Sequence, residues 1–124
     1  MALTFRTHAR ESAGVVILDI SGRIVLGDGA KDLSRKMAEL LSAGHNKILL
    51  NLVEATYVDS SGLGELVSSY GSVTKAGGKV KLLNVQPRVA DLLKMTKLHT
   101  LFETFSDESQ AVGSFQENQT ATSA

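Results

Sequence analysis

Residues 56–66 read TYVDSSGLGEL, and this stretch marks a point where a strand gives way to a helix. Its first three residues, Thr, Tyr and Val, favour strands. The Asp and the two Ser that follow are typical residues at a helix start. After them, Leu63, Leu66 and Val67 recur at helical spacing. The stretch therefore predicts a strand-to-helix junction that carries two hydroxyl groups.

Short apolar runs elsewhere in the chain predict the strands of a sheet. The runs VVILDI at 15–20, KILLNL at 47–52 and KVKLLNV at 79–85 are aliphatic or β-branched, and turn-forming residues bound them. The opening residues 3–7 alternate between apolar and polar side chains. A short polar turn at 12–14 follows, so we expect an antiparallel edge hairpin formed with the run at 15–20.

Helical spacing of apolar residues separates these strands and fixes the fold class. Four helices are expected: around 33–41, from the quoted junction to 77–78, from Pro87, and after Ser106. Strands that alternate with helices in this way predict an α/β domain with a mixed, partly parallel sheet of about four to five strands and about four helices.

The chain length and the polar end predict one domain with a tail. At 124 residues the chain is long enough to bury one core without disulfides or a structural metal. We expect the domain to occupy residues 1–115. Residues 116–124, QENQTATSA, are small and polar, so a disordered C-terminal tail is expected there.

Composition limits the classes of partner. Thirteen Lys and Arg balance thirteen Asp and Glu, which gives no reason to expect a nucleic-acid or membrane-surface binder. The absence of cysteine removes disulfides, thiol catalysis and thiolate zinc sites. No apolar run approaches the roughly 18 residues of a membrane span, and the charged N-terminus does not resemble a secretory signal. We therefore expect a soluble, cytoplasmic protein.

The motifs of common active sites are incomplete. The glycine pairs at 27–29 and 62–64 lack the third glycine of a dinucleotide-binding loop, and the Gly-Lys at 78–79 lacks the other residues of a P-loop. The three histidines, His8, His45 and His99, show no spacing typical of metal ligands or of a catalytic base. We therefore predict no catalytic residues, no metal site and no cofactor.

The triplet Asp59-Ser60-Ser61 offers more capping groups than one helix start needs. A helix start leaves backbone N–H groups unpaired, and each of these side chains could accept a hydrogen bond from one of them. A phosphate on one hydroxyl would meet the positive end of the helix dipole and free backbone donors. From the residues alone, capping and phosphorylation both stay open.

The motif Asp-Ser-Ser-Gly-Leu-Gly at 59–64 resembles the signature of a known family when it is read with its surroundings. With the strand at 47–52 before it and KLLNVQPRVADLLKMTKL at 81–98 after it, the motif is similar to that of STAS domains, specifically the bacterial anti-sigma factor antagonists, or anti-anti-sigma factors. The similarity runs from Leu3 to about Phe115.

The resemblance implies a regulatory switch. In that family an anti-sigma factor serine kinase phosphorylates the first serine of the motif, which matches Ser60, and a Ser/Thr phosphatase removes the phosphate. The unmodified protein binds the anti-sigma factor and so releases a sigma factor for transcription. ATP and magnesium would belong to the kinase, so the resemblance implies a non-enzymatic protein without a cofactor, and we expect a monomer or weak dimer.

The resemblance also implies roles for the neighbours of Ser60. Asp59 would flank the acceptor and help to orient it, and Ser61 would cap the helix. The segment Gly62-Leu63-Gly64 would belong to the surface that binds the partner, with the glycines allowing close approach. These residues and the phosphate acceptor together form the expected site.

One position departs from the family pattern. Many members carry an acidic residue shortly after the turn at Gly22, where this chain has Val25. Asp28 is the nearest carboxylate: either it substitutes for the missing acid, or this branch of the family contacts its partner differently. Asp28 and Lys31 are both candidate contacts. Two alternative functions stay open: a STAS scaffold whose Ser60 is never modified, and weak nucleotide binding at the same surface.

Overall fold

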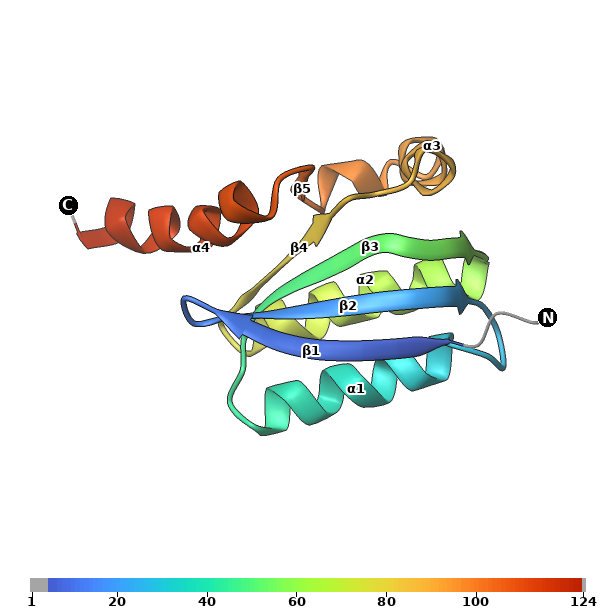
Figure 1. Cartoon of the computed structure of the whole chain (residues 1–124), viewed down its shortest axis with the longest axis horizontal. Helices are drawn as coiled ribbons and strands as arrows, with labels where there is room; N and C mark the ends of the chain where they lie inside the picture. Colours follow the sequence, from blue (N-terminus) through green and yellow to red (C-terminus); the bar gives the residue numbers. More distant parts are fainter. Residues whose placement is uncertain (1–4, 124) are drawn as a thin grey trace.

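The computed structural model describes the backbone of residues 5–123 and the side chains of residues 5–116. It contains a five-stranded sheet with the strand order β1-β2-β3-β4-β5 (Figure 1). The strands are β1 (Arg6–Ser12), β2 (Val15–Ile24), β3 (Lys47–Val58), β4 (Lys79–Leu83) and β5 (Thr104–Phe105). The helices are α1 (Ala30–Ser42), α2 (Ser60–Lys75), α3 (Pro87–Met95), the 3₁₀ turn η1 (Leu98–Thr100) and α4 (Glu108–Ser123).

The sheet is mixed, which confirms the predicted α/β class. Strand β1 pairs antiparallel with β2, and the remaining neighbours pair parallel. The β1–β2 connection is a tight turn in which both Ala13 (φ 51°) and Gly14 (φ 82°) have left-handed backbones. Such a turn matches the twist of an antiparallel pair. The expected edge hairpin is therefore present, although residues 3 and 4 of its predicted strand lie outside the described residues.

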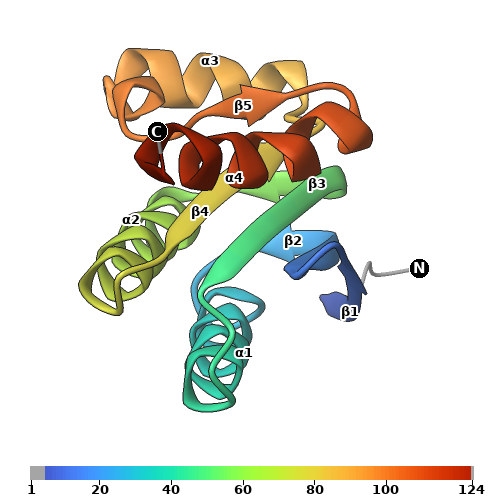
Figure 2. The same cartoon turned by 90° about the vertical axis from the view of Figure 1, so that its left-hand side faces the viewer.

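Helices cover the two faces of the sheet unequally. Helices α1 and α2 lie side by side on one face, and α4 lies on the opposite face (Figure 2). The larger core joins α1 and α2 to the sheet through residues such as Leu18, Leu33, Leu50 and Leu66. The smaller core lies under α4 and contains Val15, Ile17, Leu49, Leu83, Ala111, Val112 and Phe115. None of the described helices has both the length and the apolar character needed to cross a membrane.

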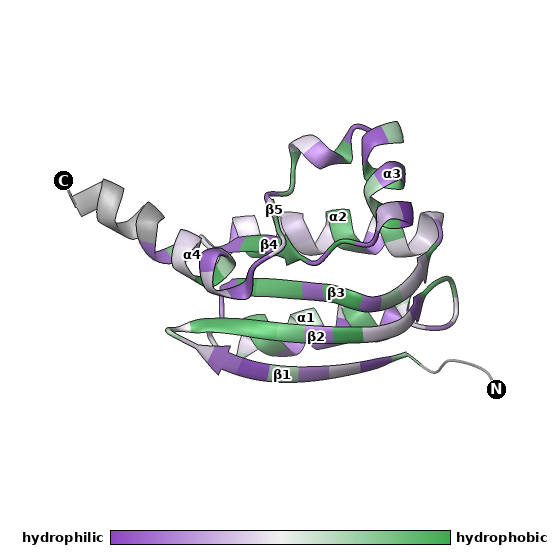
Figure 3. Cartoon of the chain, turned by 45° about the horizontal axis from the view of Figure 1, so that its top comes forward, coloured by the Kyte–Doolittle hydropathy of each residue, from purple (hydrophilic) through white to green (hydrophobic). Residues whose placement is uncertain are grey.

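Helix α4 covers only one end of its face. Along β2, Val15 and Ile17 are buried beneath the helix, whereas Asp19 and Ser21, which follow at the same two-residue spacing, are partly exposed. Strand β1, at the edge, is largely hydrophilic along its length (Figure 3). The second half of this sheet face is therefore polar and open.

Two cations fasten α4 to the sheet. Lys81 of β4 is 2% exposed, and its ammonium lies 2.9 Å from the Ser114 hydroxyl and 4.8 Å from the centre of the Phe115 ring. Arg10 of β1 pairs with both Glu108 and Asp19 at 2.7 Å. The hydrogen bonds from Arg10 lower the pKa of both carboxyl groups. A buried ammonium is tolerated here because the Glu103 carboxylate pairs with it at 3.1 Å, while a hydroxyl and an aromatic face replace part of its hydration.

The backbone of α4 continues to Ser123, into the segment expected to be a tail. Its described apolar contacts with the sheet end at Phe115. The division of the chain into a domain at 1–115 and a disordered tail at 116–124 stays a prediction.

Deletion of residues 117–124 should leave the melting temperature unchanged, because the deleted segment contains no large apolar residue that could add to the core. Phe115→Ala is the matched control. It removes a buried aromatic ring and should lower the free energy of unfolding by about 3–5 kcal/mol. Thermal and denaturant unfolding check both variants, and a fall of several degrees on deletion would show that these residues dock.

Candidate functional site at the start of helix α2

Asp59 is the N-terminal cap of α2. Its backbone is extended (φ −98°, ψ −173°), and its Oδ1 accepts a 2.8 Å hydrogen bond from the Gly62 N–H. The expectation that Ser61 caps the helix is wrong. A cap must have a non-helical backbone, and Ser61 is already the second residue within α2. Asp59, one of the three candidate caps and also expected to orient the acceptor, therefore starts the helix.

The same carboxylate holds the loop that connects β2 to α1. The Oδ2 atom of Asp59 accepts from the Leu26 N–H at 3.1 Å, while the Asp59 N–H donates to the Ile24 carbonyl at 3.3 Å. Within the loop, Val25 and Asp28 exchange two backbone hydrogen bonds of 3.0 Å. The hydrogen bonds from Gly62 and Leu26 lower the pKa of Asp59, so the carboxylate is charged near neutral pH.

The two serines differ in exposure. Ser60 is exposed at the first position of α2, and Ser61 is half-buried. No hydrogen bond to the Ser60 hydroxyl is formed within the described residues. Ser60 therefore presents an accessible hydroxyl at a helix N-terminus, next to a negatively charged cap.

The two glycines of the motif have different surroundings. A side-chain carbon on Gly62 would lie 1.9 Å from the Ile24 carbonyl oxygen, whereas one on Gly64 would meet nothing within 4 Å. Gly62 and Leu63 are buried. Gly62 and Leu63, both expected on the partner surface, instead face inward: Gly62 lets α2 approach Ile24 of β2, and Leu63 belongs to the larger core. Gly64 is the exposed residue of this segment.

The β2–α1 loop brings further exposed residues to the site. Asp28 in the loop and Lys31 in the first turn of α1 are both exposed, as expected of candidate contacts. Val25 is 9% exposed and takes part in the turn. The structure adds Leu26, which the sequence did not indicate: it is 77% exposed and hydrogen-bonded through its backbone to Asp59.

The comparisons with known sequences match most of the chain. The family model described as STAS domain matches residues 6–111. A TM1081 homologue from Thermotoga neapolitana is 35% identical over 78 residues, which are 63% of this chain and 69% of the homologue. The anti-sigma F factor antagonist of Paenibacillus polymyxa is 31% identical over 101 residues, which are 80% of this chain and 85% of that protein.

Solved structures agree with the sequence matches. The crystal structure of TM1081 from Thermotoga maritima superposes with a TM-score of 0.82 at 25% identity and covers 89% of this chain and 94% of that one. The phosphorylated form of the Bacillus cell fate determinant SpoIIAA shares the fold, with a TM-score of 0.67 at 18% identity over 89% of this chain and 97% of that one. The chain belongs to the STAS domain family, in the branch whose members include named anti-sigma factor antagonists.

Gly62→Ala should destabilise the fold and Gly64→Ala should not. The new methyl group at position 62 collides with a backbone carbonyl, so α2 must move away from β2, and we expect a loss of about 1–3 kcal/mol. At position 64 the methyl group meets open space, and alanine is about 0.5–1 kcal/mol better than glycine within a helix. Urea unfolding of both variants gives the comparison, and equal stabilities would contradict the packing described for Gly62.

Asp59→Ala should remove a pH-dependent part of the stability. Because the pKa of Asp59 is lowered by folding, its contribution is fully present above its usual value of 3.8 and is lost as pH falls through the lower folded value. The stability difference between the parent and Asp59→Ala should be constant from pH 7 to about pH 5 and shrink in more acidic solution. Denaturant unfolding as a function of pH measures it, and a difference that grows on acidification would contradict the account.

Proposed function

We propose that this protein is an anti-sigma factor antagonist whose binding is gated by phosphorylation of Ser60. The observation that carries the proposal is the exposed Ser60 hydroxyl, unpaired within the described residues, at a helix start that Asp59 fastens to a neighbouring loop. The named function of its relatives supports the same class of activity. A protein with a similar fold has been solved in a phosphorylated form, and this supports gating by phosphorylation.

The junction can accept a phosphate without unfolding. A phosphate monoester carries about −1.5 to −2 charges near neutral pH, and the N-terminus of a helix favours negative charge. Ser60 is exposed, so the added group extends into water and enters no packed region. Asp59 uses its carboxylate on Gly62 and Leu26, which leaves those two hydrogen bonds in place beneath the phosphate.

The unmodified surface combines a neutral hydroxyl with an apolar group. Ser60 and Gly64 contribute from α2, and Leu26, Asp28 and Lys31 contribute from the loop and the start of α1. An exposed leucine held on a hydrogen-bonded turn is suited to enter an apolar pocket of a partner, since little loop ordering is then needed on binding. A phosphate beside it would have to be desolvated and would repel carboxylates of the partner.

Two proposed partners would add and remove the phosphate. An anti-sigma factor serine kinase would bind this surface, supply ATP and magnesium, and transfer the terminal phosphoryl group from ATP to the Ser60 oxygen. A Ser/Thr phosphatase would restore the hydroxyl by hydrolysis. This chain would act only as substrate and ligand. Its effect on transcription would follow from occupying the anti-sigma factor and so freeing a sigma factor.

Ser60→Ala should bind the anti-sigma factor as the unmodified parent does, because it keeps a small neutral group at the surface. The phosphorylated parent should bind about 10- to 150-fold more weakly, which corresponds to about 1.4–3 kcal/mol. Ser60→Glu, with a single charge and a different shape, should fall between them. Titration calorimetry of the four forms against the cognate anti-sigma factor measures the series.

The unfolding free energies of Ser60→Ala and Ser60→Glu serve as the control. Both should lie within about 0.5 kcal/mol of the parent, because Ser60 is exposed and is not the cap. Equal affinities for all four forms would contradict the gating and leave a scaffold whose serine is not a switch. A loss of binding in Ser60→Ala would show that the hydroxyl itself is required.

A further inference from the structure

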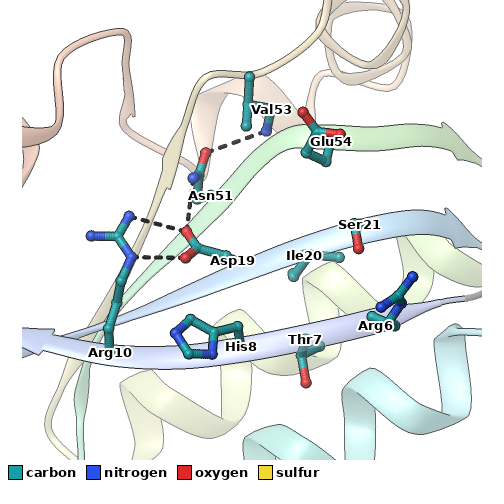
Figure 4. Close-up of a pocket in the computed structure, with 10 residues that line it drawn as sticks. All are labelled: Arg6, Thr7, His8, Arg10, Asp19, Ile20, Ser21, Asn51, Val53 and Glu54. Carbon is teal, nitrogen blue, oxygen red and sulfur yellow. Dashed lines mark hydrogen bonds and ion pairs between the residues drawn. The ribbon is translucent and has the colours of Figure 1, made fainter.

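A groove lies on the open half of the sheet face beside α4. It has a volume of about 540 Å³, and residues of β1, β2 and β3 line it (Figure 4). Helices α1 and α2 lie on the other face of the sheet, so this groove is separate from the surface proposed around Ser60 (Figure 2). The groove and its residues play no part in the proposed switch.

Part of the groove is already occupied by an internal hydrogen-bond network, in which one guanidinium faces two carboxylates. Arg10 donates to Asp19 at 2.7 and 3.1 Å and to Glu108 at 2.7 and 2.8 Å. Asp19 also accepts from the Asn51 amide at 2.8 Å, and the Asn51 oxygen accepts from the Asn84 amide at 3.3 Å. This chain of hydrogen bonds crosses the sheet from β1 to the end of β4. Its polar groups have partners, so it forms a rigid floor rather than a set of free binding groups.

The neighbouring row of residues across β1, β2 and β3 has side chains without partners in the described part of the chain. Arg6 of β1 is paired in register with Ser21 of β2, and Ser21 is paired with Glu54 of β3. These three side chains line the same cavity. None of them forms a hydrogen bond or ion pair among the described residues, and Arg6 and Glu54 are both exposed. A free guanidinium and a free carboxylate therefore flank a free hydroxyl.

The spacing of this row suits a compact molecule with both charges. Neighbouring strands lie about 4.8 Å apart, so the Cα atoms of Arg6 and Glu54 are separated by about 10 Å. Two side chains on strands this far apart leave room between them for a small molecule placed over Ser21. Next to Glu54, Val53 is 41% exposed and also lines the cavity, and it supplies an apolar wall.

We propose that this groove binds a small zwitterion of the α-amino acid type. Its carboxylate would accept hydrogen bonds from the Arg6 guanidinium and the Ser21 hydroxyl, and its ammonium group would donate to the Glu54 carboxylate. An aliphatic side chain would lie against Val53. The charges of Arg6 and Glu54 cancel. An anion would pair with Arg6 but face the like charge of Glu54, and a cation would pair with Glu54 but face Arg6, so the groove selects against ligands with only one sign of charge.

Titration of the ¹⁵N-labelled chain with L-leucine, followed by amide chemical shifts, tests the proposal. Saturable shifts are expected for residues 6–8, 19–21 and 51–54, with a Kd of about 1 mM or below. L-Leucinamide lacks the carboxylate and 4-methylpentanoate lacks the ammonium group, so both should bind at least about ten-fold more weakly. Inorganic phosphate should produce no saturable shift in these residues.

Substitutions of Arg6 and Glu54 test the side chains proposed to bind the two charged ends of the ligand. Arg6→Ala and Glu54→Gln should each raise the Kd for L-leucine at least about ten-fold. Lys94→Ala, which removes an exposed charge from α3, is the matched control and should leave it unchanged. The proposal is overturned if L-leucine produces no saturable shifts, if the three organic probes bind equally, if phosphate binds through Arg6 alone, or if neither groove substitution changes the affinity.

Discussion

The Asp59 carboxylate makes the two hydrogen bonds on which the proposed Ser60 site depends. One oxygen caps α2 through Gly62, and the other holds the β2–α1 loop through Leu26. Since β3 ends immediately before Asp59, this single residue joins a strand end, a helix start and a loop. The positions of Ser60 and Leu26 relative to each other follow from that junction. Gly62 permits it, because α2 can approach the Ile24 carbonyl only without a side chain there.

The two faces of the sheet are covered by different helices, and each carries one of the two proposed sites. On one face α1 and α2 bury the larger core, and the proposed switch lies at the start of α2. On the other face α4 buries a smaller core and leaves the polar row around Asp19 open. Arg10 belongs to this second face, where it pairs with Asp19 in the sheet and with Glu108 at the start of α4. The two proposed sites lie on opposite faces and share no residue, so a substitution in one should leave the other unchanged.

Apolar spacing predicted the order of strands and helices but not their full lengths. Strand β2 continues to Ile24 and β3 to Val58, beyond the expected ends at 20 and 52. The extensions carry Ser21 and Glu54 on the open face. Because polar residues interrupt an apolar run, the sequence pattern predicts a loop where the strand in fact continues. Strand β5 has only two residues and no periodicity to detect.

The candidate site at Ser60 was proposed from the motif and stays a proposal, whereas the helix cap could not be chosen from the sequence. Choosing the cap among three adjacent polar residues requires backbone angles, which assign it to Asp59. Leu26 carries no sequence signal, because a single leucine in a glycine-containing turn is not periodic.

Mass spectrometry of the protein isolated from its native cells, with phosphatases inhibited and the modified residue mapped by peptide fragmentation, tests the central proposal most directly. The account predicts one phosphate, on Ser60, because it is the exposed hydroxyl of the junction. Phosphate on Ser61 or on the C-terminal serines, with Ser60 unmodified, would contradict it.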